Sequence, residues 1–133
     1  MSITRDFDWK PLALLGYRAE TAISAASLQL SQTSVRMGED LAFTVEIQSA
    51  ADTPQDLMID YVVHHRKGNG KLAPKVFKLA KKRLNPRETL RLTKRHAFRP
   101  LSTRVYYSGR HAIELQINGQ RWGWQAFELV FAS

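Results

Sequence analysis

The sequence predicts an all-β fold, an antiparallel sandwich of about seven strands preceded by a short helical segment. Two observations support this prediction. From residue 23 onward, apolar and polar residues alternate with a period of two, which is typical of strands with one buried face. Turn-forming residues interrupt the alternation at short intervals, and no stretch between the expected strands reads as a long crossover helix. The 133-residue length and the 44% apolar content suit one domain with a single core.

The helical segment is expected within residues 9–20, WKPLALLGYRAE, because Pro11 suits a first helical turn and Gly16 suits a C-terminal cap. A helix of barely two turns is not stable alone, so its leucines need a surface to pack against. The sequence therefore predicts a junction over residues 1–22 and a sandwich domain over residues 23–133.

The strands follow in order, and the clearest is LAFTVEIQ, which places Leu41, Phe43 and Val45 on one face with polar residues on the other. Asn118-Gly119 is the strongest hairpin signal in the chain. The first strand begins at Ile23, and the others are expected at residues 41–48, 56–65, 75–84, 89–98, 110–117 and 120–131.

The chain contains no cysteine, which excludes disulfides, a thiolate nucleophile and a cysteine-based zinc site. An immunoglobulin-like sandwich of the fibronectin kind is therefore favoured over an antibody-type domain. No apolar run approaches the roughly 20 residues that span a bilayer. Arg5, Asp6 and Asp8 are charged residues where a secretory signal would need an uninterrupted apolar stretch. We expect a soluble cytoplasmic protein without a membrane partner.

Positive charge is concentrated between His64 and His111. Fifteen Lys and Arg residues against one acid, Glu88, give this segment a charge of +14, whereas the rest of the chain carries −6, which accounts for the total of +8. Charge separated in this way attracts polyanions and raises their rate of encounter. The alternative is an ordinary solvated surface, although such surfaces usually mix the two signs.

The loop motif KGNGK lies inside this basic segment, with Arg66, Lys67, Lys71 and Lys75 on or beside it. Glycines let backbone N–H groups approach a phosphate closely, so the loop is a candidate clamp for a nucleic-acid backbone. The motif is neither a Walker loop nor a dinucleotide fingerprint. A flexible hairpin end is the alternative interpretation.

The strands expected at residues 75–84 and 89–98 extend the basic surface. If they are neighbours, Lys78 and Lys82 on one and Arg91 and Arg95 on the other form a basic wall. Four aromatic residues offer stacking surfaces for bases, although packing under the N-terminal segment is the favoured interpretation for the two tryptophans. They are Tyr106, Tyr107, Trp122 and Trp124.

The sequence contains no recognisable catalytic apparatus. Asp60 and His64 are roughly 13 Å apart along one strand, too far for a hydrogen-bonded dyad, and nothing resembles a nucleophile elbow. The other histidines, His65, His96 and His111, have no carboxylate or cysteine at a ligand spacing, so neither a metal site nor a cofactor is expected.

Two stretches, IDYVVHHRKGNGKLAPKVFKL and ETLRLTKRHAFRPLSTRVYYSGRHAIELQING, resemble the C-terminal immunoglobulin-like domain of bacterial HEAT-repeat DNA alkylation repair glycosylases. The resemblance covers about residues 10–133 and implies that the sandwich grips DNA around an alkylated base. The helical-repeat domain, which holds the catalytic acid in such enzymes, is missing, so no catalytic residue is carried over. The resemblance implies DNA contacts for His65, Arg66, Lys67, Lys71, Lys75, Lys94, Arg95 and Arg99.

The sequence thus favours a non-catalytic accessory domain that binds the phosphate backbone of double-stranded DNA, with a HEAT-repeat domain in cis or in trans as the catalytic partner. The alternative is a protein-interaction or structural β-sandwich that docks on a helical-repeat partner through its apolar N-terminal segment and exposed strand edges.

Overall fold

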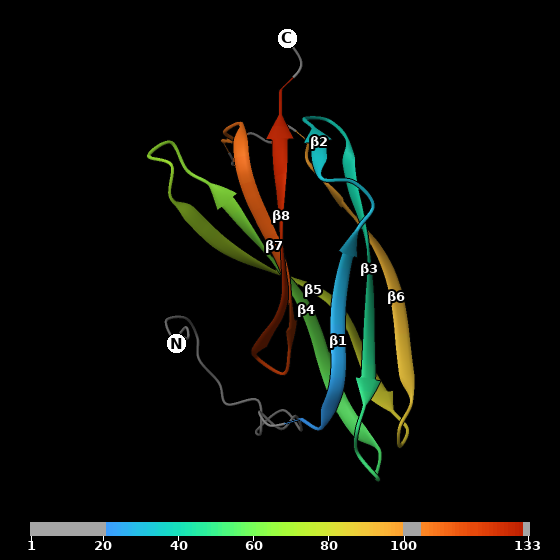
Figure 1. Cartoon of the computed structure of the whole chain (residues 1–133). Coiled ribbons are helices and arrows are strands. Elements are labelled where there is room, and N and C mark those ends of the chain that lie inside the picture. The colour runs from blue at the N-terminus through green and yellow to red at the C-terminus, as the bar shows by residue number, and fades with distance from the viewer. Residues whose placement is uncertain (1–20, 100–104, 132–133) are drawn as a thin grey trace.

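The chain forms two β-sheets packed into a sandwich, shown in Figure 1 as a computed structural model that describes residues 21–99 and 105–131. The prediction of an all-β immunoglobulin-like fold is confirmed. The three-stranded sheet has the order β1-β3-β6, and the five-stranded sheet has the order β2-β8-β7-β4-β5. The strands are β1 (Ile23–Leu30), β2 (Ser34–Arg36), β3 (Asp40–Ser49), β4 (Gln55–Arg66), β5 (Leu72–Leu84), β6 (Thr89–Ala97), β7 (Gly109–Ile117) and β8 (Gln120–Val130).

The alternation of apolar residues did not predict β2, which has only three residues and pairs parallel to the end of β8. Its middle residue, Val35, is fully buried. A period of two cannot be recognised in so short a strand. The helix expected within residues 9–20 lies outside the described residues, and the domain boundary after residue 22 stays a prediction. In the described ranges no helix is long and apolar enough to span a membrane.

The core lies between the sheets and follows the predicted alternation. On β3, Leu41, Phe43, Val45 and Ile47 are buried, and each second residue points away from the core. On β4, the side chains of Leu57, Ile59, Tyr61 and Val63 face them from the other sheet. The edge of the Phe43 ring meets the Tyr61 ring with centroids 5.0 Å apart, an arrangement favourable for aromatic pairs.

The outer face of β4 departs from the predicted half-buried pattern. Asp60, Val62 and His64 alternate with the core residues, yet they are buried as well. The reason is that β4 lies between β5 and β7, and long side chains from the neighbouring strands cover it. The Trp124 ring reaches across from β8, the strand beyond β7, and its centre lies 4.5 Å from that of the His64 ring.

The predicted basic wall is wrong, because β5 and β6 are not paired with each other. β5 pairs with β4 at the edge of the larger sheet, and β6 pairs with β3 at the edge of the smaller one. They face each other across one open side of the sandwich, joined by the turn at residues 85–88.

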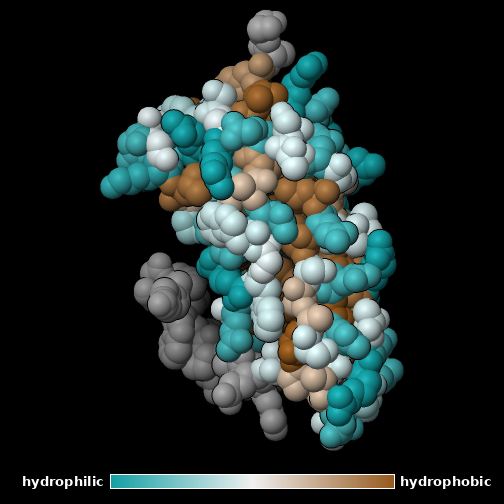
Figure 2. Space-filling view, viewed as in Figure 1, coloured by the Kyte–Doolittle hydropathy of each residue, from teal (hydrophilic) through white to brown (hydrophobic). Residues whose placement is uncertain are grey.

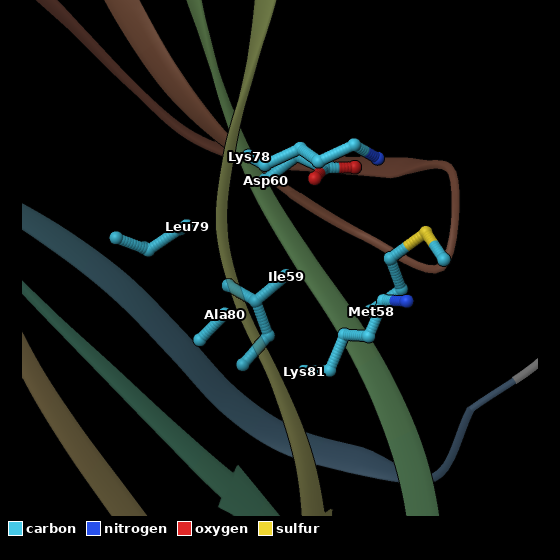
Figure 3. Close-up of a pocket in the computed structure, with 7 residues that line it drawn as sticks. All are labelled: Met58, Ile59, Asp60, Lys78, Leu79, Ala80 and Lys81. Carbon is cyan, nitrogen blue, oxygen red and sulfur yellow. The ribbon is translucent and has the colours of Figure 1, made fainter.

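An irregularity in β5 also changes the predicted directions of its side chains. Lys78 lies opposite Asp60 on the outer face, as expected, but the register then shifts by one residue at Leu79. After this bulge Lys82 lies opposite Leu57, on the side that faces the core, instead of pointing outward. Figure 3 shows the region, with Lys78 and Asp60 directed one way and Leu79 the other.

The hairpin predicted at Asn118-Gly119 is confirmed between β7 and β8. Both residues have positive φ, 47° and 88°, as a tight type I′ turn requires. The Asn118 side chain also accepts a hydrogen bond of 2.7 Å from the Met58 amide, which ties the turn to β4.

Candidate nucleic-acid interface

The β4–β5 hairpin carries the basic loop and projects from one end of the sandwich (Figure 1). Its tip is closed by backbone hydrogen bonds from Lys67 N to Lys71 O and from Gly70 N to Lys67 O, of 2.7 and 2.9 Å. The Asn69 side chain accepts a further bond of 2.9 Å from the Lys71 amide. The loop is therefore a defined turn, and Gly70 supplies the positive φ, 85°, that it needs.

Two glycines allow the segment that precedes and begins β7 to brace this hairpin. A Cβ atom on Gly68 would lie 3.3 Å from the Tyr107 ring, so the loop backbone rests against that ring. A Cβ atom on Gly109 would lie only 2.8 Å from Cδ of Arg66, so the Arg66 stem packs directly on the Gly109 backbone. This segment therefore braces the hairpin at two points, Tyr107 and Gly109.

Ion pairs decide where positive charge remains unneutralised. Four arginines of the basic segment are paired with acids of the acidic segments, whereas no carboxylate of residues 21–99 or 105–131 forms an ion pair with Lys67, Lys71 or Lys75. Exposed pairs add little stability, but they cancel charge locally. The paired arginines are Arg83 with Asp56 (3.1 Å), Arg87 with Asp52 (2.7 Å), Arg91 with Glu46 (2.6 Å) and Arg99 with Asp40 (2.9 Å).

The structure brings together four of the eight residues that are predicted to contact DNA, and it places a fifth near them. Arg66, Lys67, Lys71 and Lys75 share the hairpin, where Figure 2 shows hydrophilic residues gathered. The Lys75 ammonium lies 5.9 Å from the centre of the Phe77 ring, which contacts the ring of His96 on β6. Lys94 lies two residues before His96 and follows the same face of β6, so it approaches the open side from the opposite sheet.

The other three residues that are predicted to contact DNA lie elsewhere. Arg95 is exposed on the outer face of the smaller sheet. Arg99 donates hydrogen bonds to the Gly38 carbonyl and to Asp40, at 2.8 and 2.9 Å, so it fixes the β2–β3 turn. His65 is corrected outright as a DNA contact: it is only 7% exposed, and its ring packs against that of Phe98 between the sheets.

His65 belongs to a buried cluster of rings beneath the hairpin. The ring of His111 lies 5.8 Å from that of His65, and the Phe98 ring contacts both. His96 joins the cluster through Phe98, and its Nδ1 shares a 2.8 Å hydrogen bond with the Tyr61 hydroxyl. Burial raises the pKa of Tyr61 to about 12, so this hydroxyl stays protonated at physiological pH.

We expect the protein to lose stability as the pH falls below about 6.5, the ordinary pKa of histidine. Burial lowers the pKa of His111 in the folded state, and its hydrogen bond to the Gly109 carbonyl offsets this only in part. The unfolded chain then binds more protons, which lowers the free energy of unfolding by at most about 1.4 kcal/mol per pH unit for one histidine. Urea unfolding of wild type and His111→Gln at several pH values checks this prediction. If the free energy of unfolding falls equally with decreasing pH in both proteins, His111 is excluded as the cause.

The outer face of the larger sheet carries a polar network. The Glu114 carboxylate accepts a hydrogen bond of 3.0 Å from Arg121 and lies 2.9 Å from Nε2 of His64. Arg121 also donates to Gln116, whose amide lies 3.5 Å from Asp60. Burial raises the pKa of Asp60, an effect that Lys78 and Gln116 oppose. The network thus pairs Glu114 with Arg121 and joins Asp60 to them through the Gln116 amide.

No metal site is evident in the part of the chain that the structure describes. Its histidines and acids form no group of three or more that could hold a metal ion. A shallow pocket of about 120 Å³ lies at the β5 bulge, where Figure 3 shows the side chains that line it. Asp60 is the only acid lining it, so the pocket holds no pair of carboxylates for acid/base chemistry.

Comparison with known proteins identifies this domain. Over residues 24–131 the sequence matches the family described as "Uncharacterised protein YhaZ, C-terminal Ig-like domain". It is 33% identical to the protein YhaZ of Bacillus subtilis over 113 residues, which cover 85% of this chain and 31% of YhaZ.

Solved structures show the same fold. The alkylpurine DNA glycosylase AlkC of Pseudomonas fluorescens, solved bound to DNA containing an abasic site analog, matches 89% of this chain and 33% of AlkC, with a TM-score of 0.82 and 30% identity. The β-glucosidase EmGH1 of Erythrobacter marinus matches with a TM-score of 0.69 at 14% identity, over 83% of this chain and 16% of the enzyme, and shows the fold alone. The chain spans about a third of the length of YhaZ and AlkC. It belongs to the family of YhaZ C-terminal Ig-like domains.

Proposed function

We propose that this chain is a non-catalytic DNA-binding domain that holds the phosphate backbone of duplex DNA with its β4–β5 hairpin. The observation that carries the proposal is the position of Lys67, Lys71 and Lys75, which have no ion pair with a described carboxylate and lie on or beside a braced loop. A fixed loop presents cations and backbone N–H groups at the same place each time, which is what a phosphate contact needs.

The setting we propose is the repair of alkylated bases. The similarity to AlkC supports a DNA-repair context, because that protein is an alkylpurine DNA glycosylase bound to DNA. This chain corresponds to a third of AlkC, so the base-excising chemistry belongs, in our proposal, to a HEAT-repeat domain in the same protein or in a partner.

Neutralising Lys67, Lys71 and Lys75 to Gln is expected to weaken binding to all duplexes alike. Each lost phosphate contact should flatten the slope of log K against log salt by about 0.9, so the triple variant should lose about 2–3 units of slope. Fluorescence anisotropy of a labelled duplex of about 20 base pairs, titrated at roughly 50 to 200 mM salt, measures both effects.

The chain offers a matched control for this experiment. Substituting Arg83, Arg87 and Arg91 by Gln removes the same formal charge from positions that are already paired with acids. The proposal requires the lysine triple to lose far more affinity than the arginine triple. Equal losses of affinity in the two triple variants would mean that binding depends only on the net charge of the domain, and the hairpin would no longer be the binding site.

Docking on a helical-repeat protein is the second candidate function, favoured by the two thirds of YhaZ and AlkC that this chain does not cover. The two functions are compatible and respond differently to salt. Phosphate contacts weaken steeply with salt, whereas an apolar interface persists when charges are screened. Co-purification of a partner in high salt is therefore the discriminating observation.

A further inference from the structure

The indole of Trp124 lies on the outer face of the larger sheet. It is 48% exposed, whereas Trp122, two residues earlier on β8, packs against the core. Residues two apart on a regular strand share a face. Something must therefore turn Trp124 outward.

A bulge in β8 produces this reversal. Trp122 pairs with Leu115 and Gln125 pairs with Ile113, so two residues of β8, Gly123 and Trp124, lie opposite the single residue between them on β7. Gly123 has φ of 66°, the left-handed conformation of a bulge glycine. A Cβ atom on Gly123 would lie 3.4 Å from the Leu28 amide, so β1 packs closely at this point.

The surface under Trp124 is compact and electrically neutral. The indole lies against the His64 ring at an angle of 41°, and the Glu114 carboxylate beside His64 is held by Arg121. Val62 and Ala112 on the same face are fully buried, so water does not reach this part of the sheet. One side of the indole rests on this floor, and nearly half of its surface is open.

Arg66, one cation of the hairpin, lies on the same face of β4 as His64, which the indole contacts. His64, which the indole covers, precedes Arg66 by two residues on β4, a rise of roughly 7 Å that equals the rise of about two nucleotides. An exposed aromatic ring next to cations that hold a backbone is the arrangement by which proteins bind unpaired bases.

We propose that Trp124 stacks on an unpaired base of a DNA strand whose phosphates the β4–β5 hairpin holds. This inference rests on the proposed function and adds a preference for DNA with an unpaired or displaced nucleotide. A nucleobase fits the feature better than a protein does, because the exposed apolar side chains on this face are few, mainly Trp124, Val76, Leu72 and Val130. Together they offer on the order of a few hundred Å², less than the roughly 800 Å² per partner of a stable protein interface.

The test uses two duplexes of about 20 base pairs, one fully paired and one with a single extra, unpaired 2-aminopurine, whose fluorescence falls when it stacks. Wild type is expected to bind the second duplex about tenfold more tightly and to quench its 2-aminopurine. Trp124→Leu should lose both effects and keep its affinity for the paired duplex, whereas Trp124→Tyr should retain most of the quenching. Val76→Ala, which removes an exposed apolar side chain of the same face, is the matched control and should behave as wild type.

The alternatives are distinguishable. If wild type binds both duplexes equally and leaves the 2-aminopurine fluorescence unchanged, the stacking proposal is overturned and the hairpin proposal stands. If it binds neither duplex at low salt, both proposals fall. If Trp124→Leu weakens binding to both duplexes equally, Trp124 contributes no selectivity for an unpaired base, which also overturns the inference. The wild-type quenching measurement needs no variant, so misfolding of Trp124→Leu would not remove the test.

Discussion

Phe98→Ala is expected to lower the free energy of unfolding by about 3–5 kcal/mol, the usual cost of removing a fully buried ring. Phe98 is 0% exposed and contacts the rings of His65, His96 and Phe127. Its backbone is fixed too, because its amide donates to Glu39 O at 3.0 Å and its carbonyl accepts from Gly38 N at 2.6 Å. The neighbours therefore have little freedom to close the cavity. Urea unfolding measures the loss.

Tyr107→Ala is the matched control for Phe98→Ala. It also removes an aromatic ring, but that ring is 42% exposed and lies against the edge of the basic loop, at Gly68. Its cost in unfolding free energy should be less than half that of Phe98→Ala. Similar costs for the two variants would mean that the ring cluster beneath the hairpin is not the densely packed part of the core.

Gly109→Ala is expected to destabilise the protein by about 1–3 kcal/mol from backbone strain alone, because Gly109 has φ of 125°, where side chains are rarely tolerated. The new Cβ would also lie 2.8 Å from Cδ of Arg66, so the Arg66 stem must move. Since that stem braces the basic hairpin, the variant should bind duplex DNA more weakly than wild type. Urea unfolding and anisotropy titration measure the two effects separately.

Gly38→Ala separates the strain from the clash. Gly38 has a similar φ, 100°, but nothing lies within 4 Å of the position its Cβ would take. It should therefore lose stability through strain while leaving DNA affinity unchanged. If both variants bind DNA as wild type does, the contact between Arg66 and Gly109 does not position the hairpin, and the loop is stable without its brace.

Alternation of apolar residues predicted the sandwich because burial on one face imposes a period of two on every long strand. The same alternation already placed His65 on the inner face, since Ile59, Tyr61 and Val63 precede it at steps of two. The resemblance to DNA alkylation repair proteins, in contrast, implies a DNA contact for His65 because it lies in the basic motif HHRKGNGK. Local periodicity predicts the burial of His65, whereas the turn residues of the motif predict the exposure of Lys67 and Lys71, whose contact with DNA stays a prediction.

Other features depend on register, which the sequence does not display. The bulges at Leu79 and Gly123 each turn later side chains to the other face, so Lys82 and Trp124 do not point where unbroken alternation puts them. The ion pairs depend on register as well: Arg91 meets Glu46 only because β6 pairs with β3 at that offset. The pairing of strands that are distant in the sequence therefore decides which basic side chains are without an ion pair and can bind a ligand.

The position of β5 has a consequence for the behaviour of the protein in concentrated solution. β5 is a thirteen-residue strand with one unpaired edge, and such edges invite pairing with another copy of the chain. Lysines at positions 75, 78, 81 and 82 make two such edges repel each other. Lys75, which we assign to DNA, is thus also part of the protection against self-association. A phosphate backbone bound there would cancel part of the repulsion and let neighbouring domains approach edge to edge along one duplex.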